Sequence, residues 1–197
     1  MADPTVAVGL LERAIGYARG SVAVVTPPLL SRPTPCAGWD LRMLLDHLND
    51  SLGALHDIVH SGRIGLSAPP AGGRGPAEHA AADLVATFRD RLGRLLGVWA
   101  GTGAGDHLLA VGGLPLAASL VAGTGAVEIA VHAWDVSSAC GHRRPIPPAL
   151  ATDLLRFSRL VVTDATRHPQ FAAPVAVSPL ASPSDRLVAF LGRSPAP

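Results

Sequence analysis

The sequence GLPLAASLVAGTGAVEIAVHAWDV, from Gly113 to Val136, is the most apolar stretch of the chain, yet it contains Glu128 and His132. A helix that is apolar on every side is normally buried, and a buried carboxylate or imidazole is unfavourable unless it is paired or bound to a metal. At about 100° per residue, Glu128 and His132 lie one turn apart on a single stripe. Thr124 and Asp135 extend this stripe in the two directions. The stretch therefore predicts a central core helix with a functional stripe.

The composition favours a single globular domain. The chain has 197 residues, of which 48% are hydrophobic and 16% charged, so it can bury a sizeable core. A net charge of +1 gives no reason to expect nucleic acid or an anionic membrane as partner. All sixteen Lys or Arg positions are arginine, which together with abundant Ala, Gly and Pro indicates a GC-rich, bacterial coding sequence.

Neither a secretion signal nor a membrane helix is expected. Asp3 and Glu12 lie in the first residues, where a signal peptide would have a basic start and an apolar run. Glu128 and His132 interrupt the one candidate membrane span. Two widely spaced cysteines do not indicate a disulfide framework. We therefore expect a reduced, cytoplasmic protein.

Helical periodicity covers most of the chain. Asp40 is a good N-cap and Gly62 a good stop for one of these helices, and a short extended piece is expected within the sequence HLLAV at residues 107–111. The expected helices are approximately 5–25, 41–61, 77–100, the apolar helix that ends near residue 141, and 148–167.

These patterns predict an all-α bundle formed by one domain, residues 1–197. The fifth helix is additional, and residues 168–197 form a Pro-rich tail that packs on the bundle and contains a short amphipathic turn at DRLVAFLGR. Gly123 and Gly125 would weaken an isolated helix, so we expect them to permit close approach of neighbouring helices. The same helices could also pair across a homodimer interface.

A metal site needs a third ligand besides Glu128 and His132, and His47 is the best candidate. It borders the apolar arc of its helix, which can face the apolar helix across the bundle. His56 and His60 lie on the opposite, polar face and are expected to be ordinary solvated residues. Two imidazoles and one carboxylate suit Zn²⁺, or Ni²⁺ or Fe²⁺, and leave a coordination position open. The spacing alone is equally compatible with a buried Glu–His pair that binds no metal.

Two segments, TPCAGWDLRMLLDHL and VEIAVHAWDV, together resemble the DinB-like superfamily. The most similar branch is the mycothiol-dependent maleylpyruvate isomerase N-terminal-domain family, in its short, single-domain form. The resemblance implies a four-helix bundle in which His47, Glu128 and His132 hold a divalent metal, usually zinc. The isomerase itself has an additional C-terminal domain for which this chain has no room, so its reaction is not simply transferred.

The resemblance implies a metal-dependent transferase or isomerase that activates a low-molecular-weight thiol, with mycothiol as co-substrate and a small electrophile as partner. A metal-bound thiol is deprotonated at neutral pH, which makes its sulfur nucleophilic. Two rival classes stay open. One is a non-catalytic metal-binding or stress-response bundle, and the other is a structural bundle in which Glu128 and His132 merely pair.

Several other residues are candidates with plain structural alternatives. Asp135 could orient a metal ligand, or it could make a structural hydrogen bond near the helix end. Trp39, Trp134 and Arg144 are candidates for a cofactor pocket, although core packing explains the tryptophans and helix capping explains the arginine. Cys36 lies just before an expected helix, where a thiol can be activated, but it is interpreted as a small buried residue.

Overall fold

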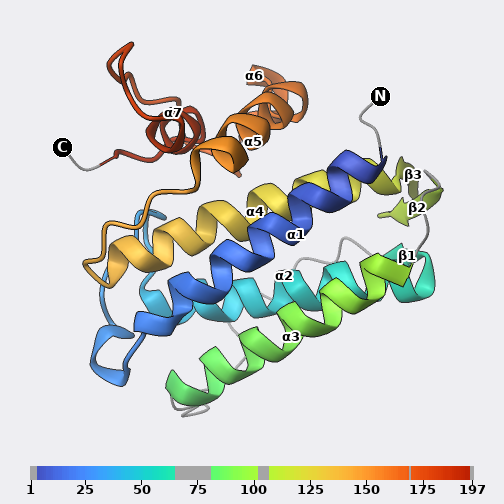
Figure 1. Ribbon diagram of the computed structural model, residues 1–197, viewed down its shortest axis with the longest axis horizontal. Coiled ribbons are helices and arrows are strands. Elements are labelled where there is room, and N and C mark those ends of the chain that lie inside the picture. Colours follow the sequence, from blue (N-terminus) through green and yellow to red (C-terminus); the bar gives the residue numbers. More distant parts are fainter. Residues whose placement is uncertain (1–3, 65–80, 102–106, 169, 196–197) are drawn as a thin grey trace.

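A computed structural model describes residues 4–64, 81–101, 107–168 and 170–195. Its core is a bundle of four long helices: α1 (Pro4–Ser21), α2 (Leu41–Ser61), α3 (Ala81–Gly101) and α4 (Ala118–Ala139). Helix α1 packs on α4, α2 packs on α3, and α2 also contacts α4 (Figure 1). The predicted all-α bundle is therefore confirmed.

Helix α2 begins and ends where its local sequence predicts. The Asp40 side chain accepts a hydrogen bond from the backbone N–H of Met43 and caps the first turn. Gly62 follows the last turn with a φ of 72°, a conformation that favours glycine. The buried face of α2 is formed by its leucines: Leu41, Leu44, Leu45, Leu48 and Leu52.

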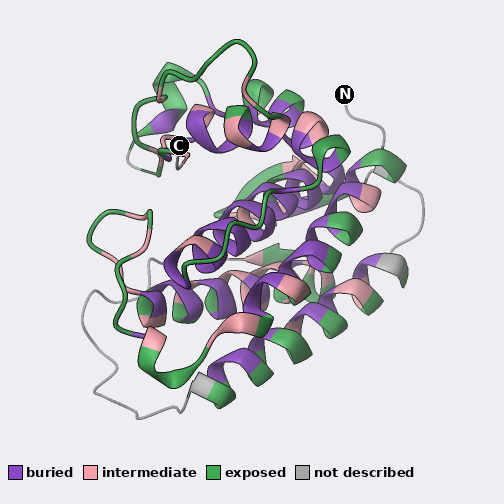
Figure 2. Cartoon of the chain, turned by 60° about the vertical axis from the view of Figure 1, so that its left-hand side comes forward, coloured by how far each residue is buried: buried purple, intermediate pink, exposed green. Residues whose placement is uncertain are grey.

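Helix α4 is buried on almost every side (Figure 2). A Cβ atom on Gly123 would lie 2.3 Å from Cε2 of Phe157, and one on Gly125 would lie 2.8 Å from Cδ1 of Leu55. Both distances are too short for a real side chain. The two glycines therefore permit the close approach that the sequence predicted, to the fifth helix on one side and to α2 on the other.

A small sheet closes one end of the bundle (Figure 1). Strand β1 (Arg63–Ile64) pairs in parallel with β2 (Leu108–Val111), and β2 pairs antiparallel with β3 (Leu114–Ala117). The extended piece expected within 107–111 is confirmed as β2. The apolar stretch from Gly113 is not helical throughout, because its first residues form the turn and β3, and the helix begins at Ala118.

The C-terminal part lies over the bundle and departs from the prediction at one point. Helix α5 spans Pro148–Val161, and the helix expected to reach residue 167 is interrupted there. Thr163 adopts an extended conformation and caps a separate short helix, α6 (Asp164–Arg167). Helix α7 (Pro183–Phe190) packs on α5 and is the predicted amphipathic turn.

At the N-terminal side, α1 is shorter than expected, since residues 22–24 and 27–29 form the short 3₁₀ helices η1 (Val22–Val24) and η2 (Pro27–Leu29). The expected start of the third helix at residue 77 lies outside the described residues. Within the described part of the chain, no helix combines the length and apolarity needed to cross a membrane.

Candidate metal centre

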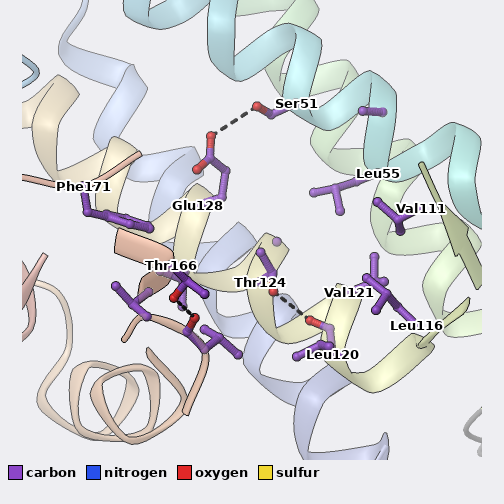
Figure 3. Close-up of a pocket in the computed structure, with 15 residues that line it drawn as sticks. Ser51, Leu55, Val111, Leu116, Leu120, Val121, Thr124, Glu128, Thr166 and Phe171 are labelled. Carbon is purple, nitrogen blue, oxygen red and sulfur yellow. Dashed lines mark hydrogen bonds between the residues drawn. The ribbon is translucent and has the colours of Figure 1, made fainter. Parts of the chain in front are cut away.

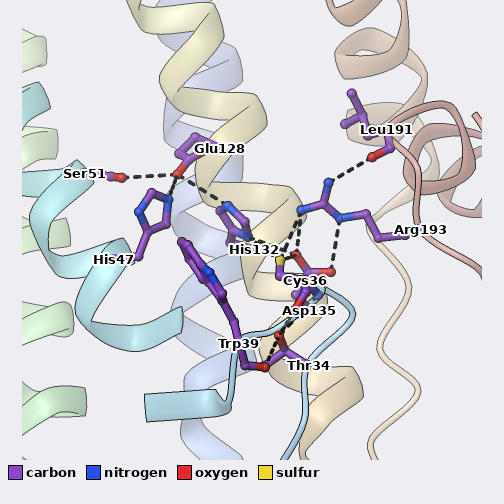
Figure 4. Close-up of polar contacts among 10 residues, drawn as sticks. All are labelled: Thr34, Cys36, Trp39, His47, Ser51, Glu128, His132, Asp135, Leu191 and Arg193. Atoms are coloured by element: carbon purple, nitrogen blue, oxygen red, sulfur yellow. Dashed lines mark hydrogen bonds and ion pairs between the residues drawn. The ribbon is translucent and has the colours of Figure 1, made fainter. Parts of the chain in front are cut away.

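Helices α2 and α4 bring His47, Glu128 and His132 together where the two helices face each other (Figure 4). The distance from Nε2 of His47 to Oε1 of Glu128 is 2.7 Å, and that from Nε2 of His132 to the same oxygen is 3.5 Å. The imidazole rings of His47 and His132 meet edge to face, with centroids 5.2 Å apart. The three ligand atoms lie within 4.8 Å of one another, so they could bind one ion.

Glu128 is held in place and kept ionised by its neighbours. Ser51 donates a hydrogen bond of 3.1 Å to the Oε1 atom that also faces both imidazoles. Burial alone would raise the pKa of Glu128, but the charge of His132 and the hydrogen bonds from His47 and Ser51 outweigh burial and lower this pKa to about 2. The carboxylate is therefore available as an anionic ligand at neutral pH.

Asp135 supports His132 from the side opposite Glu128. The distance between Nδ1 of His132 and Oδ2 of Asp135 is 2.9 Å, and Asp135 is fully buried. Burial disfavours the charged imidazole, yet Glu128 and the contact with Asp135 outweigh it and raise the pKa of His132 to about 10. When Nδ1 donates its proton to Asp135, Nε2 is the nitrogen left facing Glu128.

Arg193, which the sequence analysis missed, completes this arrangement from the C-terminal tail (Figure 4). Its Nη2 atom lies 3.0 Å from Oδ2 of Asp135, and its Nε atom lies 3.4 Å from Oδ1. Burial would raise the pKa of Asp135, but the hydrogen bond with His132 and the charge of Arg193 lower it. Gly192 has a φ of 84°, and a side chain there would meet Ala172 at 2.8 Å, so glycine is required for the turn that aims Arg193 inward.

Cys36 also lies at this cluster, contrary to its interpretation as a packing residue alone. Its Sγ atom is 3.3 Å from Oδ2 of Asp135, 3.7 Å from Nδ1 of His132 and 3.5 Å from Nη2 of Arg193. Cys36, His132 and Asp135 form a second group whose ligand atoms lie within 4.8 Å of one another. The thiol donates a hydrogen bond to Asp135 and accepts one from Arg193, and these two bonds account for its position without a second ion.

Of the three candidates for a cofactor pocket, one lies beside the ligands and two lie elsewhere. The Trp39 ring meets the His47 ring edge to face, with centroids 4.9 Å apart, so Trp39 lies beside the three ligands. Trp134 and Arg144 instead line a different cavity, of about 820 Å³. The Arg144 guanidinium lies over the ring of Tyr17, which donates a hydrogen bond to the Arg144 carbonyl oxygen.

Residues 11–137 match the family model described as mycothiol maleylpyruvate isomerase N-terminal domain. The chain belongs to this family. Two uncharacterized proteins of Mycobacterium tuberculosis, from strains CDC 1551 / Oshkosh and ATCC 25618 / H37Rv, are each 30% identical to it over 180 residues, which is 88% of this chain and 90% of each relative. No solved structure matches the chain. The family membership that the two sequence motifs indicated is therefore confirmed.

The matched family segment contains the three ligand candidates and Asp135, whereas Arg193 lies beyond it. Glu128 also borders a cavity of about 500 Å³ whose walls come from α2, the sheet, α4 and the segment after α5 (Figure 3). The candidate metal centre is therefore continuous with a space large enough for a small molecule.

Proposed function

We propose that this family member binds one divalent metal ion, preferably zinc, through His47, Glu128 and His132, and uses it to activate a low-molecular-weight thiol such as mycothiol. The convergence of two imidazole nitrogens and one carboxylate oxygen within 4.8 Å carries the proposal. This donor set matches catalytic zinc sites, which have three protein ligands and one position for an exchangeable ligand.

The surrounding residues fit such a centre. Ser51 orients the Glu128 carboxylate, and Asp135 orients His132 through Nδ1. Supporting hydrogen bonds of this kind fix ligand geometry at metal sites. Arg193 in turn neutralises Asp135, which is fully buried. The chain therefore supplies the ligands and also the groups that hold them in position.

The thiol is proposed from the family's description, which names mycothiol. When bound, a divalent ion supplies stabilisation of the deprotonated thiol, whose pKa is about 8.5 when free. The cavity beside Glu128 would hold the small electrophile to which the sulfur adds. The reaction class that this arrangement suits is thiol transfer or thiol-assisted isomerisation.

The direct test is thiol consumption by the zinc-loaded protein, measured with mycothiol and a panel of small electrophiles. We expect turnover that is lost in His47→Ala and retained in His56→Ala, because His56 lies on the outer face of the same helix. Stoichiometric metal binding without thiol consumption would contradict the enzyme proposal and favour a non-catalytic metal-binding protein.

A further inference from the structure

The cavity beside Glu128 has the size and lining of a small-molecule site. Its volume of about 500 Å³ lies within the range of about 300–1,000 Å³ that such sites occupy. Eleven of its fifteen lining residues are nonpolar, and they come from four parts of the fold. Figure 3 shows Glu128 at one end of this lining, with Leu116 and Val111 at the other.

The polar groups in the lining are already engaged within the protein. The Thr124 hydroxyl donates to the carbonyl oxygen of Leu120 at 2.9 Å, and the Thr166 hydroxyl donates to that of Val161 at 2.9 Å. Ser51 donates to Glu128. Each hydroxyl hydrogen is therefore used internally, and these oxygens offer a ligand only their lone pairs.

The charge of the lining disfavours an anionic ligand. Among the described residues that line the cavity, Glu128 is the only one with a formal charge, and none is Arg or His. In the metal-free protein, an anionic group entering this space would lose its hydration, would find no donor among the lining residues, and would face the Glu128 carboxylate. A neutral molecule would lose little hydration, and an N–H or O–H group on it could donate to the oxygens of the lining.

We infer that this cavity is the substrate subsite and that it selects a small, neutral, largely apolar electrophile, with the reactive carbon at the Glu128 end. The reaction in this inference rests on the proposed function, whereas the preference for a neutral, apolar ligand does not. It separates this chain from a protein specialised for maleylpyruvate, the compound in the family's description, because that compound carries carboxylates.

Part of the selectivity comes from outside the shared domain. Val161, Val162, Thr166 and Phe171 line the cavity, and all four lie beyond residues 11–137, which match the family model. The metal ligands and one wall thus belong to the common domain, whereas the opposite wall belongs to the C-terminal part of this chain. Related chains that differ after residue 137 are expected to accept different substrates.

The test is calorimetric titration of the full-length protein with decanamide and decanoate, two ligands of nearly equal shape that differ in charge. The titration is made on the full-length protein after treatment with a chelator. We expect one decanamide per chain and at least about tenfold weaker binding of decanoate. Equal affinities, or no saturable decanamide binding, would overturn the inference.

A matched pair of variants locates the binding. Thr124→Phe fills the cavity and should weaken decanamide binding at least about tenfold. Thr152→Phe is the control, because the Thr152 hydroxyl makes the same 2.9 Å bond within α5 but does not line the cavity. Equal effects of the two variants would place the ligand elsewhere and overturn the inference.

A second pair of variants covers the case in which Thr124→Phe does not fold, as judged by circular dichroism. Phe171→Trp narrows the cavity, whereas Phe190→Trp changes a half-buried phenylalanine outside it. Only the first should weaken decanamide binding. Because none of these titrations needs metal or thiol, their failure is distinguishable from failure of the proposed function, which metal content and thiol turnover report.

Discussion

Replacing Arg193 with methionine tests whether the C-terminal tail holds the candidate metal centre in place. The guanidinium makes one short and one longer charged hydrogen bond to Asp135, which is 0% exposed. A hydrogen bond between charged groups contributes about 1.5–3 kcal/mol, and removing one partner of a buried ion pair costs about 3–5 kcal/mol. Because His132 still contacts Asp135 in the variant, we expect the free energy of unfolding to fall by about 3 kcal/mol, the low end of this range.

The assay is urea unfolding followed by circular dichroism at neutral pH, together with a thermal melt. For a domain of this size, a loss of about 3 kcal/mol lowers the Tm by roughly 6–12 °C. Arg186→Met is the matched control, because Arg186 is an exposed arginine on the tail helix α7. Its free energy of unfolding should change by less than about 0.5 kcal/mol.

The same variant reports on the metal centre. Without Arg193 the orientation of Asp135, and through it of His132, is less restricted. Loss of such supporting contacts typically weakens metal binding about 10- to 100-fold, which competition with a chromophoric chelator measures. A stability loss below about 1 kcal/mol, or equal losses for Arg193→Met and Arg186→Met, would refute the reasoning that the tail anchors this site.

Three further predictions concern alkaline stability, helix packing and metal binding. Burial raises the pKa of Tyr17 to about 12, so the contribution of Tyr17 to the free energy of unfolding is complete below pH 10 and declines by about 2–3 kcal/mol between pH 10 and 12. In urea unfolding, Tyr17→Phe should reduce the loss of stability over this pH range. An unchanged loss of stability in the variant would refute this prediction. Gly123→Ala should lower the free energy of unfolding by about 1–3 kcal/mol through the clash with Phe157. In contrast, Gly16→Ala, where no heavy atom lies within 4 Å, should raise it by about 0.5–1 kcal/mol, and the opposite order in urea unfolding would contradict the packing. Zinc at about 100 times its dissociation constant should stabilise the protein by about 2.7 kcal/mol, and a Tm that does not respond to zinc or to its chelation would argue against binding to the native state.

Features set by neighbouring residues were predictable from the sequence. Asp40 and Gly62 fix the ends of α2 because each acts on the backbone of its own helix. Glu128 and His132 are one turn apart, so their joint position on α4 follows from helical geometry alone. The apolar character of α4 likewise predicts its central place in the bundle.

Features that depend on contacts distant in sequence were not predictable. Arg193 meets Asp135 across 58 positions, and nothing in the local sequence of the tail marks this arginine as different from the others. Cys36 reaches the same carboxylate from the loop before α2. The break after Val161 has a different cause, because the sequence does contain its signal: Thr163 is an N-cap residue that was not recognised, and it caps α6.

Elemental analysis of tag-free protein shows directly whether the chain binds a metal ion at His47, Glu128 and His132. The wild type is compared with His47→Ala, Glu128→Ala and His132→Ala, and with His56→Ala as a control on the outer face of α2. We expect about one zinc, or another divalent ion, per chain in the wild type and in His56→Ala, and its loss in the other three variants. Well-folded wild type that contains no metal, even after reconstitution, would contradict metal binding and leave Glu128 and the two histidines as a hydrogen-bonded cluster.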